Sequence, residues 1–141
     1  MKIRPATKQA VARFFRTVNR TRMRFATELL SAERLAMADE CFVAIVNRRI
    51  VGAVCIVFDN GTHAELLTEY VLKEYQGQGI GTRLSRRAIE RLAEVGRTPV
   101  DINVTSKGMD RTLDKLPKRL HRRLRLIRSY LKLGEVELPE K

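Results

Sequence analysis

Apolar residues recur every three or four positions from Thr7 to Leu30, which is the spacing of one face of a helix. These residues are Val11, Phe14, Phe15, Val18, Phe25, Leu29 and Leu30. Ser31 precedes a second helical segment over residues 33–38, and serine is a preferred residue at a helix N-terminus. The first third of the chain therefore predicts two helices, which follow a short strand over residues 2–6.

The pattern changes to β-rich runs between residues 40 and 72. Residues 40–46 and 50–58 are two such runs, and the polar residues 47–49 between them predict a hairpin. A turn over residues 59–61 leads to a further run over 64–72. This part of the chain therefore predicts three successive strands.

Glycine and proline mark the elements of the second half. Gly79 opens a helix with one apolar face, and Gly96 ends it. Residues 99–104 form a further strand, and Pro117 suits the first turn of a last helix that ends at Gly134. The order of elements predicts an α/β fold, a mixed sheet with helices packed on it, in a single domain over residues 1–141.

Length and composition agree with one globular domain. The chain has 141 residues, of which 44% are hydrophobic, enough to bury a core without disulfides. Cys41 and Cys55 lie in apolar runs, so we expect buried thiols in a reducing cytoplasm. The two histidines and two cysteines have no zinc-ligand spacing, so no metal is expected. Neither a signal peptide nor a membrane-spanning run is evident, and we expect a cytoplasmic protein.

The net charge of +12 is concentrated in two segments. Residues 1–30 hold 8 basic and 1 acidic residue, and residues 107–132 hold 10 basic and 2 acidic ones. Such clustering indicates an anionic partner, which could be nucleic acid, an acidic protein or an anionic membrane surface. The alternative is that the basic residues only keep a small domain soluble.

A glycine-rich loop lies between the predicted strand over residues 64–72 and the helix that Gly79 opens. It reads Gln76-Gly77-Gln78-Gly79-Ile80-Gly81-Thr82. Small residues at a helix N-terminus let backbone amides converge on an anion such as a pyrophosphate. A P-loop requires Lys and then Ser or Thr after its last glycine, and a dinucleotide fingerprint requires Gly or Ala at position 82. Neither pattern is satisfied.

The loop resembles that of the GNAT N-acetyltransferase family, whose motif is Gln or Arg, two residues, Gly, one residue, then Gly or Ala. Gln76, Gly79 and Gly81 satisfy it, and the order of elements is similar over most of the chain. Residues 130–134 are similar to the family's Tyr-x-Lys-x-Gly-Phe helix ending, although Glu135 replaces the phenylalanine. Residues 107–132 read as a longer basic helical insertion than usual, and the short remainder predicts truncated C-terminal strands.

The resemblance implies an acetyl-CoA-dependent enzyme. Its cofactor-binding residues would be Tyr70, Val71, Leu72, Gln76, Gly77, Gln78, Gly79, Ile80, Gly81 and Thr82. The pantetheine arm would add to the strand at Tyr70 and Val71, and a backbone N–H near Val71 or Leu72 would stabilise the developing oxyanion.

The same resemblance supplies candidate catalytic residues. Glu65 and Glu69 are four residues apart, hence expected on one strand face, and either could take the amine proton directly or through water. The alternative for both is a salt bridge to arginine. Tyr130 is the candidate acid for the leaving thiolate, unless it is a core or helix-edge tyrosine.

The basic segment leaves the acceptor open. Read as a helix, residues 118–128 place Leu120, Leu124 and Ile127 on one apolar stripe. The partner-binding candidates point away from it, and these are Arg119, Arg122, Arg123 and Arg125. We expect an acetyltransferase acting on an amine of a protein or other macromolecule, with an acidic protein or one associated with nucleic acid as the candidate acceptor. The alternative is a binding protein on the same scaffold with weak or no catalysis.

Overall fold

Six strands form one mixed sheet in which their spatial order is their order in the chain. The computed structural model describes residues 1–22, 31–59, 64–95, 99–104, 107–128 and 131. The strands are β1 (Lys2–Ala6), β2 (Glu40–Val46), β3 (Arg49–Val57), β4 (Ala64–Val71), β5 (Val100–Val104) and β6 (Leu124–Arg128). Strands β1 to β4 pair antiparallel, whereas β4–β5 and β5–β6 pair parallel. The predicted mixed, mostly antiparallel sheet is confirmed.

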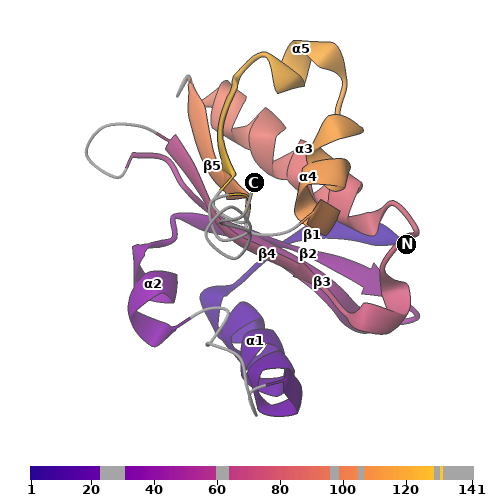
Figure 1. Cartoon of the computed structure of the whole chain (residues 1–141). Helices are drawn as coiled ribbons and strands as arrows, with labels where there is room; N and C mark the ends of the chain where they lie inside the picture. The colour runs from indigo at the N-terminus through magenta and orange to yellow at the C-terminus, as the bar shows by residue number, and fades with distance from the viewer. Residues whose placement is uncertain (23–30, 60–63, 96–98, 105–106, 129–130, 132–141) are drawn as a thin grey trace, which may run out of the picture.

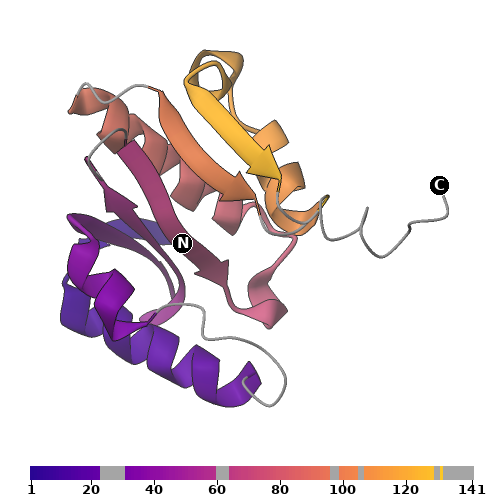
Figure 2. The same cartoon turned by 60° about the vertical axis from the view of Figure 1, so that its left-hand side comes forward.

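The helices lie on both faces of this sheet (Figures 1 and 2). One face carries α1 (Lys8–Arg22) and α2 (Ala32–Met37), which pack on buried side chains of β2 and β3. The other carries α3 (Ile80–Glu94), α4 (Lys107–Asp114) and α5 (Lys118–His121). A 3-10 turn, η1 (Lys73–Tyr75), joins β4 to the loop before α3. Each face has its own apolar core, so the sheet separates two hydrophobic layers.

Local sequence signals account for the N-terminal half. The Ser31 hydroxyl accepts a hydrogen bond from the Arg34 N–H at 3.2 Å and caps α2 as predicted. Asn47 and Arg48 both have positive φ, which suits the two-residue turn of the β2–β3 hairpin. Cys41 and Cys55 are opposite each other in this hairpin, both buried, with their sulfur atoms 3.3 Å apart.

A β-bulge in β4 overturns one expectation. Cys55 pairs with Thr68 but the next residue of β3, Ile56, pairs with Leu66, so Leu67 is the extra residue. Glu65 pairs with Val57, whose side chain belongs to the α1–α2 layer, and Glu69 pairs with Val54 of the α3 layer. Glu65 and Glu69 therefore lie on opposite faces of the sheet, and the prediction of a shared face was wrong.

The predicted last helix is also wrong. Residues 118–121 are helical, but the chain then turns and enters β6, which pairs along its whole length with β5. Leu124 and Leu126 pack on the α3 layer, whereas Ile127 is on the other face and 50% exposed. The expected stripe of Leu120, Leu124 and Ile127 does not exist, because a strand alternates its side chains every second residue.

The two basic segments are separated in space. Figures 1 and 2 place α1 and α5 at opposite ends of the molecule in both views. The basic side chains of α1 and those around α5 therefore do not form one continuous surface.

Candidate active site

The glycine loop folds as a backbone cradle at the start of α3. Gly77 and Gly79 both have left-handed φ, at 81° and 85°, a conformation that glycine adopts without strain. Gly79 is the residue before the first turn of α3. A Cβ atom added at either glycine would meet no other atom within 4 Å, so the loop faces open space.

Backbone donors of α3 point into that space. Arg83 is the first residue whose N–H bonds back within the helix, to the Gly79 carbonyl at 3.1 Å. The N–H groups of Ile80, Gly81 and Thr82 precede it and have no acceptor in the helix. Together with the partial positive charge of the helix N-terminus, they fit the pyrophosphate of acetyl-CoA. The Ile80 side chain is buried in the core, so this residue contributes through its backbone.

An opening in the sheet leads away from the cradle along β4. Strands β4 and β5 pair only at Ala64 with Val100 and at Glu65 with Asp101. Beyond that point β5 continues beside β6, as two adjacent arrows in Figure 2. The edge of β4 from Leu66 to Val71 that faces β5 therefore has no strand partner within the described part of the chain, and an extended pantetheine arm fits there as an added strand.

Val71 presents its backbone to this opening and Leu72 does not. The Leu72 N–H donates to the Val51 carbonyl at 2.8 Å, on the β3 side. Successive residues of a strand point their N–H groups to opposite sides, so the Val71 N–H points toward the opening. The Gln76 side chain donates to the Val71 carbonyl at 2.8 Å, which fixes the loop to the end of β4. Val71 is thus the better of the two predicted backbone donors.

Glu65 stands in a row of charged residues across three strands. Its neighbour on β5 is Asp101, and the neighbour of Asp101 on β6 is Arg125. Arg125 binds Asp101 through both ends of its guanidinium, at 2.6 and 3.0 Å, and this pairing raises the pKa of Arg125. The side chains face the α1–α2 side, away from α3, because Val100 and Ile102 occupy the α3 side of β5.

Glu69 has a different environment, in the layer between β4 and α3. The Ser85 hydroxyl donates to its carboxylate at 2.5 Å. Its other oxygen lies 3.5 Å from the position that a Cβ of Gly81 would take. Burial raises the pKa of Glu69 to about 7, against the opposing effect of the Ser85 hydrogen bond.

The remaining predicted side chains are placed as follows. Tyr70 lies on the α1–α2 side and packs at the edge of that apolar layer. Gln78 is exposed and Thr82 is partly exposed in the first turn of α3. Tyr130 lies outside the described residues. The helix that follows β5, α4, contains no tyrosine.

Exposed cations gather around α5. We call Lys115, Lys118, Arg119, Arg122 and Arg123 the basic cap. Arg119 reaches Glu90 at 3.7 Å. Arg125, predicted as a partner-binding residue, is instead bound to Asp101.

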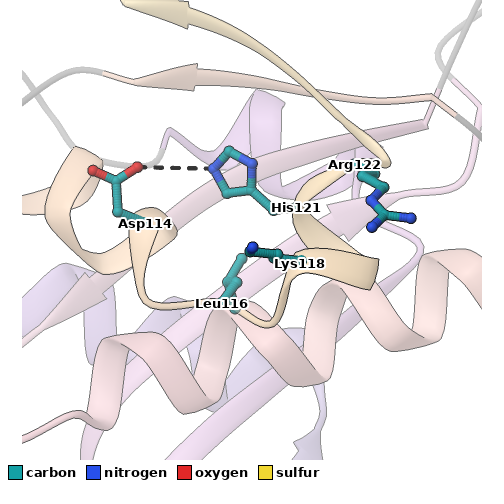
Figure 3. A pocket seen from close by; sticks show the side chains of 5 residues that line it. All are labelled: Asp114, Leu116, Lys118, His121 and Arg122. Carbon is teal, nitrogen blue, oxygen red and sulfur yellow. Dashed lines mark ion pairs between the residues drawn. The ribbon is translucent and has the colours of Figure 1, made fainter.

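A hollow of about 460 Å³ opens in this cap, lined by Asp114, Leu116, Lys118, His121 and Arg122. Figure 3 shows the ion pair of His121 with Asp114, at 3.8 Å, on one side of it. The hollow places two exposed cations beside one carboxylate.

Neither a metal site nor a membrane span is present in the part of the chain that the structure describes. No group of histidine, cysteine or acidic side chains there is arranged to hold a metal ion. No helix there is both long and apolar enough to cross a membrane.

Three functional positions escaped the sequence reasoning. Ser85 is a polar residue beside the apolar face of α3, and a polar residue at such a position could have marked it as functional. Asp101 is the one acidic residue in the strand over 100–104, which was a signal of the same kind. Thr112 of α4, whose side chain lies 3.5 Å from the position that a Cβ of Gly81 would take, gave none.

The sequence matches one family model. The model of the acetyltransferase (GNAT) family matches residues 7–112. No curated protein sequence matches the chain.

Solved structures share the fold. A GNAT-family acetyltransferase from Staphylococcus aureus superposes with a TM-score of 0.58 at 16% identity, covering 78% of this chain and 76% of that one. An aminoglycoside acetyltransferase from an uncultured soil metagenomic sample superposes with a TM-score of 0.56 at 21% identity. The match covers 80% of this chain and 82% of that one. An IAA acetyltransferase from Bacillus cereus superposes with a TM-score of 0.56 at 19% identity, and the match covers 72% of this chain. The chain spans only 63% of the length of that protein. At these identities the likeness shows the fold alone.

Proposed function

The chain belongs to the acetyltransferase (GNAT) family, and on that premise we propose that its acceptor is an amine of a protein with an acidic surface. Family membership makes it an enzyme that transfers an acetyl group from acetyl-CoA to an amine. Acetyl-CoA supplies the activated acyl group as a thioester. The acceptors named for the similar structures belong to those proteins.

One observation carries the proposal: the row Glu65, Asp101, Arg125 runs from the candidate base to β6, the strand that directly follows the basic cap. Neighbouring strands are about 4.8 Å apart, so Arg125 stands roughly 10 Å from Glu65. The Arg123 carbonyl accepts a hydrogen bond from the Val100 N–H at 2.8 Å, which fixes the cap to the same end of the sheet. An acidic surface bound at the cap would bring a nearby amine to Glu65.

Charge supports the same choice of acceptor. The net charge of +12 opposes the approach of a polycation and favours that of a polyanion. The five side chains of the basic cap are exposed, and the carboxylates of Glu90 and Asp114 next to them balance only part of their charge.

We assign roles to this chain's residues as follows. The acceptor amine arrives as an ammonium, and Glu65 takes its proton, directly or through a water. The N–H groups of β4 that face the opening, including that of Val71, hold the extended pantetheine arm, and the one nearest Glu65 donates to the thioester oxygen. Tyr130 remains our candidate for returning a proton to the sulfur.

Matched peptides test the acceptor. One lysine is flanked by aspartate and glutamate in the first peptide and by arginine in the second, and each is incubated with labelled acetyl-CoA. Mass spectrometry should show kcat/KM at least tenfold higher for the acidic peptide at low salt, and a smaller ratio at high salt. An aminoglycoside and a nucleic-acid-bound basic protein are included. Faster acetylation of either of these would replace the proposed acceptor.

A further inference from the structure

The bulge at Leu67 places Glu69 directly beneath the acetyl-CoA cradle. One carboxylate oxygen accepts a hydrogen bond from the hydroxyl of Ser85, which lies about one turn into α3. The other lies near Gly81, whose N–H is one of the free donors of the first turn. The Thr112 side chain of α4 also lies near Gly81. The carboxyl group and a bound pyrophosphate would therefore lie on two sides of a single helical turn.

No charged side chain described in the adjoining elements compensates this carboxyl group. Its partner on β3 is Val54, and the causes that shift its pKa are burial and Ser85. The charged residues at the near ends of α3 and α4 are exposed or engaged elsewhere: Arg83, Arg86, Lys107 and Arg111 are exposed, Arg87 lies over the Phe42 ring, and Asp110 pairs with Arg128.

We propose that Glu69 is a proton-binding positioning residue of the cofactor site, so that acetyl-CoA binds with uptake of a proton at this carboxyl group. An ionised Glu69 and the pyrophosphate compete for the same positive helix end. Each disfavours the other across a short distance, and the burial of Glu69 weakens the screening of its charge. Protonation removes that repulsion and leaves Glu69 as a neutral hydrogen-bonding partner of Ser85.

The affinity of the wild type for acetyl-CoA should then fall as pH rises through neutrality. Burial raises the pKa of the free protein's Glu69 to about 7, so the group is half ionised there. Binding of the anion raises that pKa further. If the shift is about one unit, affinity falls about tenfold between pH 6 and pH 8.5. This inference concerns acetyl-CoA and is independent of the acceptor.

Calorimetry on the whole chain tests it. Acetyl-CoA is titrated at pH 7.5 into wild type and Glu69→Gln, in buffers of different ionisation enthalpy. For each acetyl-CoA bound, the wild type should take up more protons than the variant, and the difference should be a substantial fraction of one proton. Protons exchanged by the phosphates of acetyl-CoA itself are common to both and cancel. Equal proton uptake in the two proteins, with parallel curves of affinity against pH, would overturn the proposal.

Two further variants separate this effect from a structural one. Ser85→Ala removes the bond that favours ionised Glu69, so the fall in affinity should move to higher pH. Glu74→Gln removes an exposed carboxylate on η1 and should leave the shape of the affinity curve unchanged. A shift toward lower pH in Ser85→Ala, or no shift, contradicts the proposal even where Glu69→Gln does not fold.

Discussion

Glu65 and Asp101 form the last paired position of β4 and β5 before the two strands part. The predicted base therefore stands at the closed end of the opening, and the glycine cradle stands at the other end of β4. A molecule held by its pyrophosphate at the cradle and extended along β4 ends near Glu65. This geometry separates the candidate acetyl-CoA-binding residues from the candidate base.

Glu65→Gln should lower kcat by about a hundredfold, because the amide cannot accept the amine proton. Acetyl-CoA affinity, measured by calorimetry, should remain within about twofold, since the cradle is at the opposite end of β4. Glu33→Gln on α2 removes an exposed carboxylate and serves as the control. Full turnover of Glu65→Gln would assign proton removal to an ordered water path instead.

Tyr130→Phe should lower turnover by about a hundredfold if this phenol protonates the leaving sulfur. Binding of acetyl-CoA should be preserved, because the cradle uses backbone groups. Tyr75→Phe, on η1, is the matched loss of a phenolic oxygen. Equal turnover of the two variants would remove Tyr130 from the mechanism.

Gly79→Asp and Gly79→Asn separate charge from shape at the cradle. Asparagine and aspartate have nearly the same size, and both tolerate positive φ better than other side chains do. There is also room for either at this glycine. The aspartate adds a negative charge beside the pyrophosphate site, so we expect it to bind acetyl-CoA at least tenfold more weakly than the asparagine variant, about 1.4 kcal/mol. Equal affinities would place the phosphates elsewhere.

The free energy of unfolding should depend on pH through Glu69. Its pKa in the folded chain, about 7, is above the ordinary value of 4.5, so folding favours the protonated group. This contribution is fully present below pH 4.5 and is lost as pH rises to about 7. Relative to Glu69→Gln, the wild type should lose at most about 3 kcal/mol over that range. Thermal unfolding at pH 4.5, 6 and 8 measures it, and a constant difference in Tm would contradict it.

Replacing Arg119, Arg122 and Arg123 with glutamine should reduce kcat/KM for the acidic peptide and flatten its salt dependence. Arg125 is left in place, because it is bound to Asp101. The control replaces Arg13, Arg16 and Arg20 of α1, which removes the same charge at the opposite end of the molecule. If both triple variants lose activity equally, net charge rather than the basic cap governs the acceptor.

Elements with a local cause could be predicted from the sequence. Ser31, the hairpin turn at 47–48 and the glycines before α3 each act on their own backbone neighbours. The strand β6 was missed because Leu120, Leu124 and Ile127 match a helical period as well as Leu124 and Leu126 match a strand. Pairing with β5, a contact remote in sequence, decides between the two periods.

The bulge at Leu67 explains why the candidate site was only partly predictable. Regular alternation of side chains along β4 would place Glu65 and Glu69 on the same face of the sheet. The one extra residue of the bulge places them on opposite faces. Its trace in the sequence is the adjacent pair Leu66 and Leu67, both buried on opposite sides of the sheet. The raised pKa of Glu69 follows from its burial on the α3 side, against the opposing effect of the hydrogen bond from Ser85, a residue that no motif marks.

The brief pairing of β4 with β5 also has a mechanical meaning. Hydrogen bonds divide the sheet into a block of four strands and a block of two, joined at two residue pairs. A pantetheine arm in the opening would supply further hydrogen bonds between these two blocks. Amide hydrogens of β4 that face the opening, such as that of Val71, would then exchange slowly with solvent only while the chain holds acetyl-CoA. While bound, acetyl-CoA would thus act as a seventh strand that joins the two blocks of the sheet.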